Sequence, residues 1–232
     1  PPRAPHPAYT LKPEEPDEAE ADHLADLAKG AGPAPSHPRR STPTGHTAML
    51  QLQRFLNAVT GTPMWVRDRR LNFVAANPLG RTLYAPMLDD PVNQGNMARF
   101  TFLNPASQKF FPDWEENADD MAATLRSYAG QDPLDGRLTD LIGELATRSD
   151  AFRHRWSRHH VRHHHAGIKR IHHPVVGDLE LPYQAMELPM NRDWFMFAFT
   201  SEPGSPTEER LQLLSSVAAN DDAPRRSPDP LQ

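Results

Sequence analysis

The sequence predicts a single α+β domain in which one antiparallel sheet carries several inserted helices. Three observations lead to this fold class. Between residues 47 and 156, apolar residues recur three and four positions apart in several segments, which is the period of amphipathic helices. Two short strand-like segments precede most of these helices, and three longer ones follow them. Strands at both ends of a domain, with helices between them, are typical of one sheet with insertions.

The folded part of the chain is predicted to span residues 46–219. Of the 25 prolines, ten fall within residues 1–45 and three more within residues 224–230. Flanks rich in proline and poor in large apolar side chains bury too little surface to offset the entropy lost on ordering. We therefore expect a Pro-rich linker over residues 1–45, with one short helix ending at Gly30, and a disordered tail over residues 220–232.

The domain is predicted to begin with a helix and a pair of strands. From Thr47 onward, four large apolar residues fall three and four apart until Gly61 ends the run, which indicates a helix. Strands are predicted over residues 63–66 and 71–76. The polar residues 68–70 between them form the expected turn.

Helices are predicted for most of the middle of the chain. Asn77 can cap a short helix that begins at Pro78 and ends near residue 84. Residues 86–103 are apolar but show no clean period. Asp113 and Glu116 then have the spacing of a capping box. Apolar stripes of helical period follow at residues 114–128, 138–145 and 152–156, the last in a segment that starts at Ser149.

The C-terminal third is predicted to form three strands and a helix. Strands over residues 168–175 and 179–188 are joined at Gly177-Asp178, which is a hairpin signal. The segment 194–200 is apolar on both faces, so we expect it to be a central strand covered on each side. Residues 205–208 supply a cap, a first-turn proline and a capping-box glutamate for a final helix. This order of elements is similar to that of PAS-like domains.

Composition and motif content exclude several classes of protein. The chain has no cysteine, which excludes disulfides and cysteine–zinc sites. Its longest apolar run, residues 194–199, is too short to span a membrane, and no signal-peptide pattern opens the chain. The G-x-S-x-G, G-x-G-x-x-G and G-K-[ST] motifs are absent, and the carboxylates of residues 115–120 are expected to be solvated. We expect a soluble, cytoplasmic protein that is not an enzyme, needs no cofactor and makes no membrane contact.

Residues 153–173 are rich in histidine and arginine. Eight of the twelve histidines and six Lys or Arg residues fall here, and no acid does. The pairs His159/His163 and His160/His164 have a helical metal-ligand spacing, but no nearby carboxylate could complete the site and the neighbouring cations would repel a metal ion. A solvated surface with no metal site is the favoured interpretation. A surface for nucleic-acid phosphates and a pH-responsive or partner-facing surface stay open as alternatives.

Several large apolar residues lie on predicted buried faces. Their ordinary interpretation is a filled hydrophobic core. However, a sheet covered by helices can also enclose an apolar pocket of ligand size. The candidate pocket residues are Trp65, Phe73, Leu83, Trp114, Trp156, Phe195 and Phe197, with His159 as a polar group at the mouth.

Ordered motifs along the whole domain resemble one family of ligand-binding domains. They are Asn77, Asn104-Pro105, Phe111–Glu115, Trp156–His159, Lys169–Gly177 and Glu202–Ser205. In this order, over about residues 46–219, they are similar to the MmyB-like ligand-binding domain of actinobacterial regulators. The resemblance implies a PAS-like fold C-terminal to a helix-turn-helix domain of the Xre class. It also implies a sensor that holds a fatty acid or a similar apolar small molecule.

The resemblance further implies how such a domain would act. Ligand occupancy would bias the geometry of a homodimer and so change operator binding. DNA would be contacted only through the helix-turn-helix domain, which we expect to be missing from this chain, although residues 11–27 look like its last helix. His160 and His163–His165 depart from the family pattern, which has charged residues there. A histidine-based metal-binding protein and a dimerisation module with a filled core remain as alternative functions.

Overall fold

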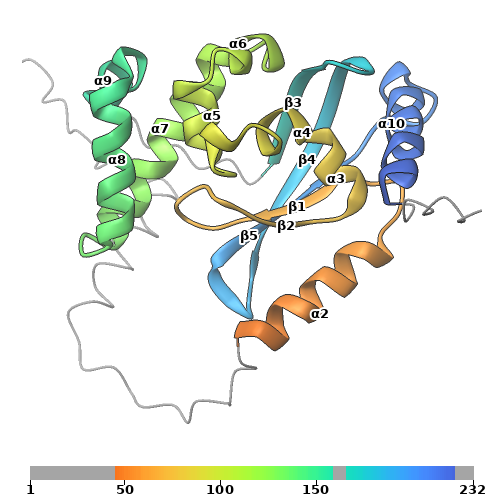
Figure 1. Ribbon diagram of the computed structural model, residues 1–232, viewed down its shortest axis with the longest axis horizontal. Coiled ribbons are helices and arrows are strands. Elements are labelled where there is room, and N and C mark those ends of the chain that lie inside the picture. The colour runs from red at the N-terminus through yellow and green to blue at the C-terminus, as the bar shows by residue number, and fades with distance from the viewer. Residues whose placement is uncertain (1–44, 159–165, 223–232) are drawn as a thin grey trace, which may run out of the picture. The chain divides into compact units, whose positions relative to one another are not determined.

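The computed structural model describes residues 45–158 and 166–222. The short helix expected before Gly30, the candidate His159 and most of the C-terminal tail lie outside the described residues. The elements, in chain order and as labelled in Figure 1, are α2 (Gly45–Ala58), β1 (Met64–Arg67), β2 (Phe73–Ala76), α3 (Pro78–Leu83), α4 (Ala85–Leu88), η1 (Pro91–Asn93), α5 (Met97–Leu103), α6 (Ala106–Phe110), α7 (Trp114–Gln131), α8 (Gly136–Arg148), α9 (Asp150–Trp156), β3 (Ala166–His173), β4 (Gly177–Leu188), β5 (Asn191–Phe199) and α10 (Pro206–Asp222).

The strands form one five-stranded sheet in the order β2-β1-β5-β4-β3, and every neighbouring pair is antiparallel (Figure 1). The predicted α+β class, an antiparallel sheet with inserted helices, is confirmed. The predicted central strand is confirmed as well, because β5 lies between β1 and β4. Trp65 of β1 faces Phe197 of β5 in the register, so segments from the two ends of the domain meet in the middle of the sheet.

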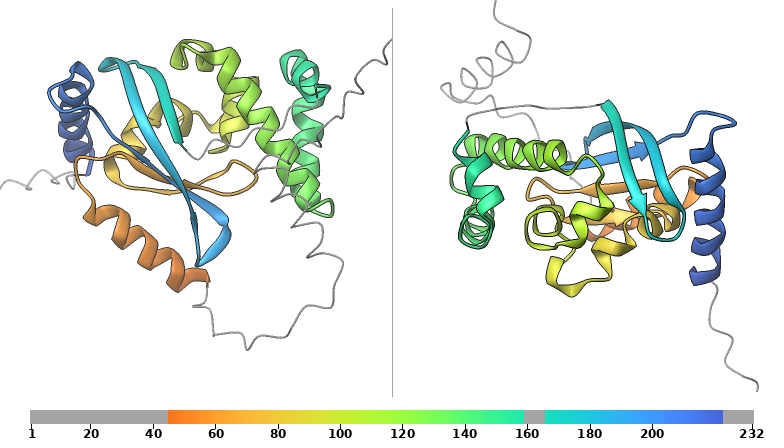
Figure 2. Two further views of the ribbon diagram at one scale, coloured as in Figure 1. Left: turned by 180° about the vertical axis from the view of Figure 1, so that it is seen from behind. Right: turned by 90° about the horizontal axis from the view of Figure 1, so that it is seen from above.

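Alternation along the strands gives the sheet two different faces. The outer face packs against α2 through a small core formed by Leu52, Leu56, Met64, Val66, Ala75 and Met196. The inner face packs against the inserted helices. It carries Trp65, Arg67, Lys169, Ile171, Leu179, Leu181, Tyr183, Phe195, Phe197 and Phe199. Both views of Figure 2 place α10 beside the β3–β4 hairpin, where it contacts β4 and α3.

Helix α3 is fixed to the sheet by the predicted cap residue Asn77. Its Oδ1 accepts hydrogen bonds from the backbone N–H of Gly80 at 2.8 Å and of Met64 at 3.0 Å. Helix and strand approach so closely that a Cβ atom on Gly80 would lie 2.3 Å from the carbonyl oxygen of Met64. Glycine at position 80 is therefore a packing requirement of the α3–β1 contact.

Buried asparagines organise the segment that shows no apolar period. Asn96 caps α5 by accepting from the Arg99 N–H at 3.0 Å, and its Nδ2 donates to the Arg70 carbonyl at 2.8 Å. Asn93 donates to the Met87 carbonyl at 2.9 Å. The short helices of this segment are held in place by hydrogen bonds from asparagine side chains. The sequence of the segment therefore shows no apolar stripe of helical period.

The structure confirms two predicted caps. Ser149 Oγ accepts from the Phe152 N–H at the start of α9 at 3.2 Å. At α10, Ser205 Oγ accepts from the Glu208 N–H at 3.2 Å, and the Glu208 carboxylate accepts from the Gly204 N–H at 2.7 Å. Each helix therefore begins where its sequence signal places it.

Three local predictions are wrong. Asp113 makes no side-chain cap bond to α7, because its carboxylate instead accepts from Arg170 Nη1 at 3.0 Å. The hairpin turn occupies residues 174–176, and Gly177, with φ 80°, already opens β4. Strand β2 begins at Phe73, two residues later than expected, because Leu71 adopts a left-handed φ of 63°.

Among the described residues, no helix is long and apolar enough to cross a membrane.

Candidate functional site

Three of the predicted pocket residues meet on the inner face of the sheet. The Trp65 ring lies between Phe73, at 5.3 Å between ring centroids, and Phe197, at 4.8 Å. Both contacts are stacked, with interplanar angles of 8° and 16°. The strands β2, β1 and β5 each contribute one ring, so the register of the sheet creates this aromatic stack.

The stack continues into residues that the sequence analysis did not select. Tyr84, which follows α3, contacts Trp65 at 5.1 Å, and Tyr183 of β4 contacts Phe197 at 6.0 Å. Leu83, a predicted pocket residue, is fully buried in the same core. No sequence motif identified either tyrosine as a site residue. For Tyr183, however, the alternation of inward-facing and outward-facing residues along β4 could have placed it on the inner face.

Trp114 and Trp156 pack against the same large core as Trp65, but at a separate place between the inserted helices. Trp114 Nε1 donates to the Thr101 carbonyl and to Ser107 Oγ, both at 3.1 Å, and this ties α7 to α5 and α6. Trp156 stacks on Phe152 at 5.4 Å. The structure therefore does not bring these two tryptophans together with the Trp65 stack.

Part of the inner face stays accessible although helices cover the sheet. Phe197 lies on the central strand, yet it is only half-buried, as are Phe73 and Tyr183. A ring at the centre of a covered sheet is normally removed from solvent. The remaining exposure of these three aromatic residues indicates that the helices do not cover β2, β5 and β4 completely.

Two polar atoms beside this surface lack hydrogen-bond partners. Trp65 Nε1 and Tyr84 Oη are buried and make no hydrogen bond within the part of the chain that the structure describes. Burial raises the pKa of Tyr84, so its phenol stays protonated and keeps a hydrogen to donate. Buried polar groups in folded proteins are almost always paired, so these two atoms mark an unusual place in the core.

Arg67 is a buried cation on the same face. Its guanidinium lies over the rings of Phe195, at 4.9 Å, Phe197, at 5.3 Å, and Tyr128, at 5.7 Å. Nη1 donates to the Asp68 carbonyl at 3.2 Å and to Tyr128 Oη at 3.5 Å. The predicted pocket residue Phe195 is thus brought into contact with a cation that the sequence analysis did not select.

Lys169 brings a second cation to the inner face, at the β3 edge. Its Nζ donates to Asn117 Oδ1 at 2.6 Å and lies 5.5 Å from the centre of the Phe111 ring. Removal from water lowers the pKa of Lys169, while the carboxylates of Asp120 and Glu116 act in the opposite direction. A cavity of about 120 Å³ opens at this point and is also lined by Tyr183.

The comparison with protein families agrees with the domain described so far. Residues 49–214 match the model of the MmyB-like transcription regulator ligand binding domain. This match covers the whole sheet, all the inserted helices and about the first half of α10. The chain belongs to this family. Among curated proteins, none matches the chain significantly.

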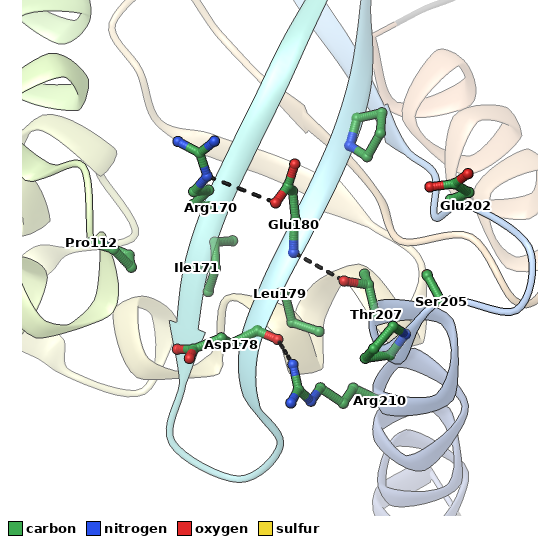
Figure 3. A pocket seen from close by; sticks show the side chains of 12 residues that line it. Pro112, Arg170, Ile171, Asp178, Leu179, Glu180, Glu202, Ser205, Thr207 and Arg210 are labelled. Carbon is green, nitrogen blue, oxygen red and sulfur yellow. Dashed lines mark hydrogen bonds and ion pairs between the residues drawn. The ribbon is translucent and has the colours of Figure 1, made fainter.

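The MmyB-like domain also carries a larger, open groove of about 590 Å³ between the β3–β4 hairpin and the start of α10 (Figure 3). Arg170 and Glu180 face each other across the two strands, with 3.9 Å between Nε and the carboxylate. Thr207 Oγ1 accepts from the Glu180 N–H at 3.1 Å, and Arg210 donates to the Asp178 carbonyl. Four of the five charged side chains that line the groove have partners within the protein, and none of the predicted pocket residues lines it.

Among the described residues of the basic stretch, which spans residues 153–173, Arg155 and His173 are buried. Arg155 is buried against α7, where it forms ion pairs with Glu115 and, at 2.8 Å, with Asp119. These carboxylates, expected to be solvated only, are therefore also partners of the basic stretch. The described residues hold no group of three or more potential metal ligands. His160 and His163–His165 lie outside the described residues.

Proposed function

We propose that this chain senses an apolar small molecule for a bacterial transcription regulator and that it binds this molecule without altering it. Membership of a regulator ligand-binding family supports the sensing role. The observation that carries the apolar ligand is the partial exposure of Phe197, an aromatic residue in the middle of the sheet. We assign the ligand to this aromatic surface, between the sheet and the inserted helices, in a fold of PAS-like type.

Simple energetics favour an apolar occupant at this surface. Covering apolar surface contributes about 25 cal/mol for each Å² removed from water. The rings of Phe73, Trp65, Phe197 and Tyr183 follow one another in contact, so one flexible apolar molecule can extend along them. Such a ligand completes the core rather than competing with hydrogen bonds made by the protein.

The position of α2 suggests how occupancy is transmitted. This helix packs on the outer face of the same strands whose inner face carries the stack, through Leu52 and Leu56. A ligand that moves β1 or β5 therefore acts directly on α2. We propose that this movement changes the geometry of a homodimer in the cytoplasm. Contact with DNA would belong to a helix-turn-helix domain of the regulator outside these residues.

Native mass spectrometry of the purified chain, followed by solvent extraction, tests the proposal. We expect a stoichiometric adduct of an apolar small molecule, or its appearance after incubation with decanoate. Phe197→Ala should weaken this adduct at least about tenfold, because it removes the central ring of the surface. Met196→Ala is the matched control, since the neighbouring side chain faces α2 and should leave the adduct unchanged.

Other outcomes of this experiment favour the alternative functions. A chain that stays bare with every apolar compound contradicts the proposal and favours a dimerisation module with a filled core. Bound zinc without an organic adduct favours a metal-binding protein that uses the histidines of the basic stretch.

A further inference from the structure

Lys169 places a primary amine in the wall of the cavity of about 120 Å³ at the β3 edge. The residue lies in the middle of β3 and is half-buried. Its Nζ donates to Asn117 Oδ1 at 2.6 Å, and Asn117 Nδ2 in turn donates to Thr101 Oγ1 at 3.3 Å. The centre of the Phe111 ring lies 5.5 Å from Nζ. These contacts fix the amine at one place beside the cavity.

The cavity has room for a small molecule only. A water molecule occupies about 30 Å³ in the liquid, so a cavity of about 120 Å³ holds about four non-hydrogen atoms. A long apolar chain does not fit, and the cavity is therefore a separate site from the aromatic surface around Phe197. Tyr183 borders both, because its ring contacts Phe197 at 6.0 Å and its side chain also lines the cavity.

The surroundings of Lys169 favour the uncharged form of its amine. A lysine in water is protonated at neutral pH and has no lone pair with which to attack a carbon atom. Burial lowers the pKa of Lys169, and the carboxylates of Asp120, Glu116 and Asp113 oppose this only in part. A larger share of the amine is therefore unprotonated, which is the form of lysine that produces imines with carbonyl compounds.

Tyr183 brings a hydrogen-bond donor to the same cavity. It pairs with Gly167, which lies two residues before Lys169 and on the same face of β3. A Cβ atom at position 167 would lie 3.2 Å from the Tyr183 hydroxyl oxygen, so the phenol lies directly over the glycine. Burial raises the pKa of Tyr183, so the phenol keeps its proton at neutral pH. A carbonyl oxygen in the cavity therefore finds a donor on the same side of the sheet as the amine.

The charges around the cavity determine which carbonyl compounds it can hold. Asp113, Glu116 and Asp120 line it and are three and four positions apart at the start of α7, so they share one side of the helix. They outnumber the lining cations Lys169 and Arg170, of which Arg170 pairs with Asp113 at 3.0 Å. The excess of carboxylates repels an anion and stabilises a positive charge on the lysine nitrogen. A neutral carbonyl compound is therefore favoured, and a protonated imine would keep the charge that the lysine carried.

We propose that Lys169 is a covalent binding site for a small neutral aldehyde, which it captures reversibly as an imine. The amine nitrogen bonds to the carbonyl carbon, and the carbonyl oxygen takes up a proton beside Tyr183. The resulting carbinolamine then loses its hydroxyl group as water while the C=N bond forms. One aldehyde and one amine give one imine and one water molecule, so no oxidant or reductant takes part. This inference goes beyond the proposed function, because it adds a second site and a different class of ligand.

Reductive trapping of the full chain with propanal and cyanoborohydride tests the proposal. The reagent reduces the imine, so each captured aldehyde becomes a stable propyl group that peptide mapping by mass spectrometry can locate. At neutral pH, we expect Lys169 to be propylated at least about tenfold faster than the exposed Lys109 in the same sample, because its amine has a lowered pKa and the cavity holds the aldehyde. Tyr183→Phe, which removes only the hydroxyl, should slow the labelling of Lys169 by about tenfold or more and leave that of Lys109 unchanged.

Each other outcome has a definite meaning. Equal rates at the two lysines would show that the cavity does not activate the amine, and they would overturn the proposal. Labelling of Lys109 alone would overturn it too, because Lys169 would then be a structural cation closed to solutes. Fast labelling of Lys169 in Tyr183→Phe would support the imine site and remove the phenol from it. The deciding comparison uses the wild-type chain, so it does not depend on the folding of a variant, and native mass spectrometry with decanoate tests the proposed function separately.

Discussion

Asn77 shows how one side chain can hold three segments of this domain together. Its Oδ1 accepts from the N–H groups of Met64 and Gly80, at 3.0 and 2.8 Å. Its Nδ2 donates to the carbonyls of Val59 and Thr62, at 2.9 and 2.7 Å. The sequence predicted the cap on α3, but it could not predict the two carbonyls, because these belong to the loop that precedes β1.

Replacing Asn77 with Asp tests this role without changing the shape of the side chain. In Asn77→Asp, an acceptor faces two carbonyl oxygens, so both bonds are lost and the carboxylate is repelled. We expect the free energy of unfolding to fall by about 2–4 kcal/mol at neutral pH. The loss should shrink in acid, where the carboxyl group regains a proton to donate. Urea denaturation at two pH values measures both effects, and a loss below 0.5 kcal/mol would contradict this account.

His173 gives the domain a specific response to acid. Its Nε2–H donates to the Thr82 carbonyl at 3.2 Å, and its Nδ1 accepts from the Val175 N–H at 3.3 Å. The second bond requires the neutral ring, because a protonated Nδ1 has no lone pair with which to accept a hydrogen bond. Burial lowers the pKa of His173 below the usual value for histidine, and the hydrogen bond to the Thr82 carbonyl opposes this only in part.

The pKa difference sets the sign of the pH dependence. As the pH falls through about 6.5, the unfolded chain binds a proton that folded His173 does not, so stability is lost below this pH. We expect His173→Gln to flatten the dependence of unfolding free energy on pH between about 7 and 5 relative to wild type. His154→Gln, at an exposed position, should keep the wild-type slope. Equal slopes in all three proteins would show that His173 does not carry the effect.

At the scale of elements, α3 and α8 differ in whether a glycine can be replaced by a larger residue. Gly80 of α3 faces the carbonyl oxygen of Met64, and a Cβ there would lie 2.3 Å from it. Gly143 of α8 has nothing within 4 Å of its Cβ position. The same substitution therefore has opposite consequences in the two helices.

Thermal denaturation of two alanine variants checks this contrast. We expect Gly80→Ala to destabilise the domain by about 2–4 kcal/mol, because α3 must move away from β1. Gly143→Ala should stabilise it by about 0.5–1 kcal/mol through helix propensity alone. A neutral Gly80→Ala would mean that α3 can shift without loss of packing.

The elements that the sequence predicted well have a local signal. Strand β5 is apolar on both faces, and α9 and α10 begin at hydroxyl caps, so neighbouring residues were enough to place them. The region from α4 to α5 lacks such a signal, because Asn93 and Asn96 organise it through bonds to residues outside their own helices. Side chains that bond to backbone groups far away in the chain produce no periodic pattern in the sequence.

At the scale of the whole molecule, pairing across the chain explains what sequence reasoning missed at the candidate site. The stack of Trp65 and Phe197 depends on β1 pairing with β5. The sequence indicated that these aromatic residues are buried, but it did not indicate that they contact each other. Arg67 stands next to the predicted polar turn of residues 68–70, and only the pairing of β1 with β5 places it over Phe195. Likewise, Arg155 belongs to a basic stretch in the sequence but is buried against acids of α7 in the fold.

The same long-range pairing makes a prediction about where a ligand acts. A ligand that binds only the folded chain adds about 2.7 kcal/mol of stability at a hundred times its dissociation constant. If decanoate covers Phe197, amide hydrogen exchange should slow in β1, β4 and β5 and stay unchanged in α8, which packs away from the sheet on α5 and α9. Protection confined to β4 and α10 would instead place the ligand in the groove of Thr207 and Arg210. Hydrogen exchange therefore distinguishes a ligand on the inner face of the sheet from a ligand bound between the β3–β4 hairpin and α10. Only a ligand on the inner face could act on α2, because α2 packs on the opposite face of the same strands.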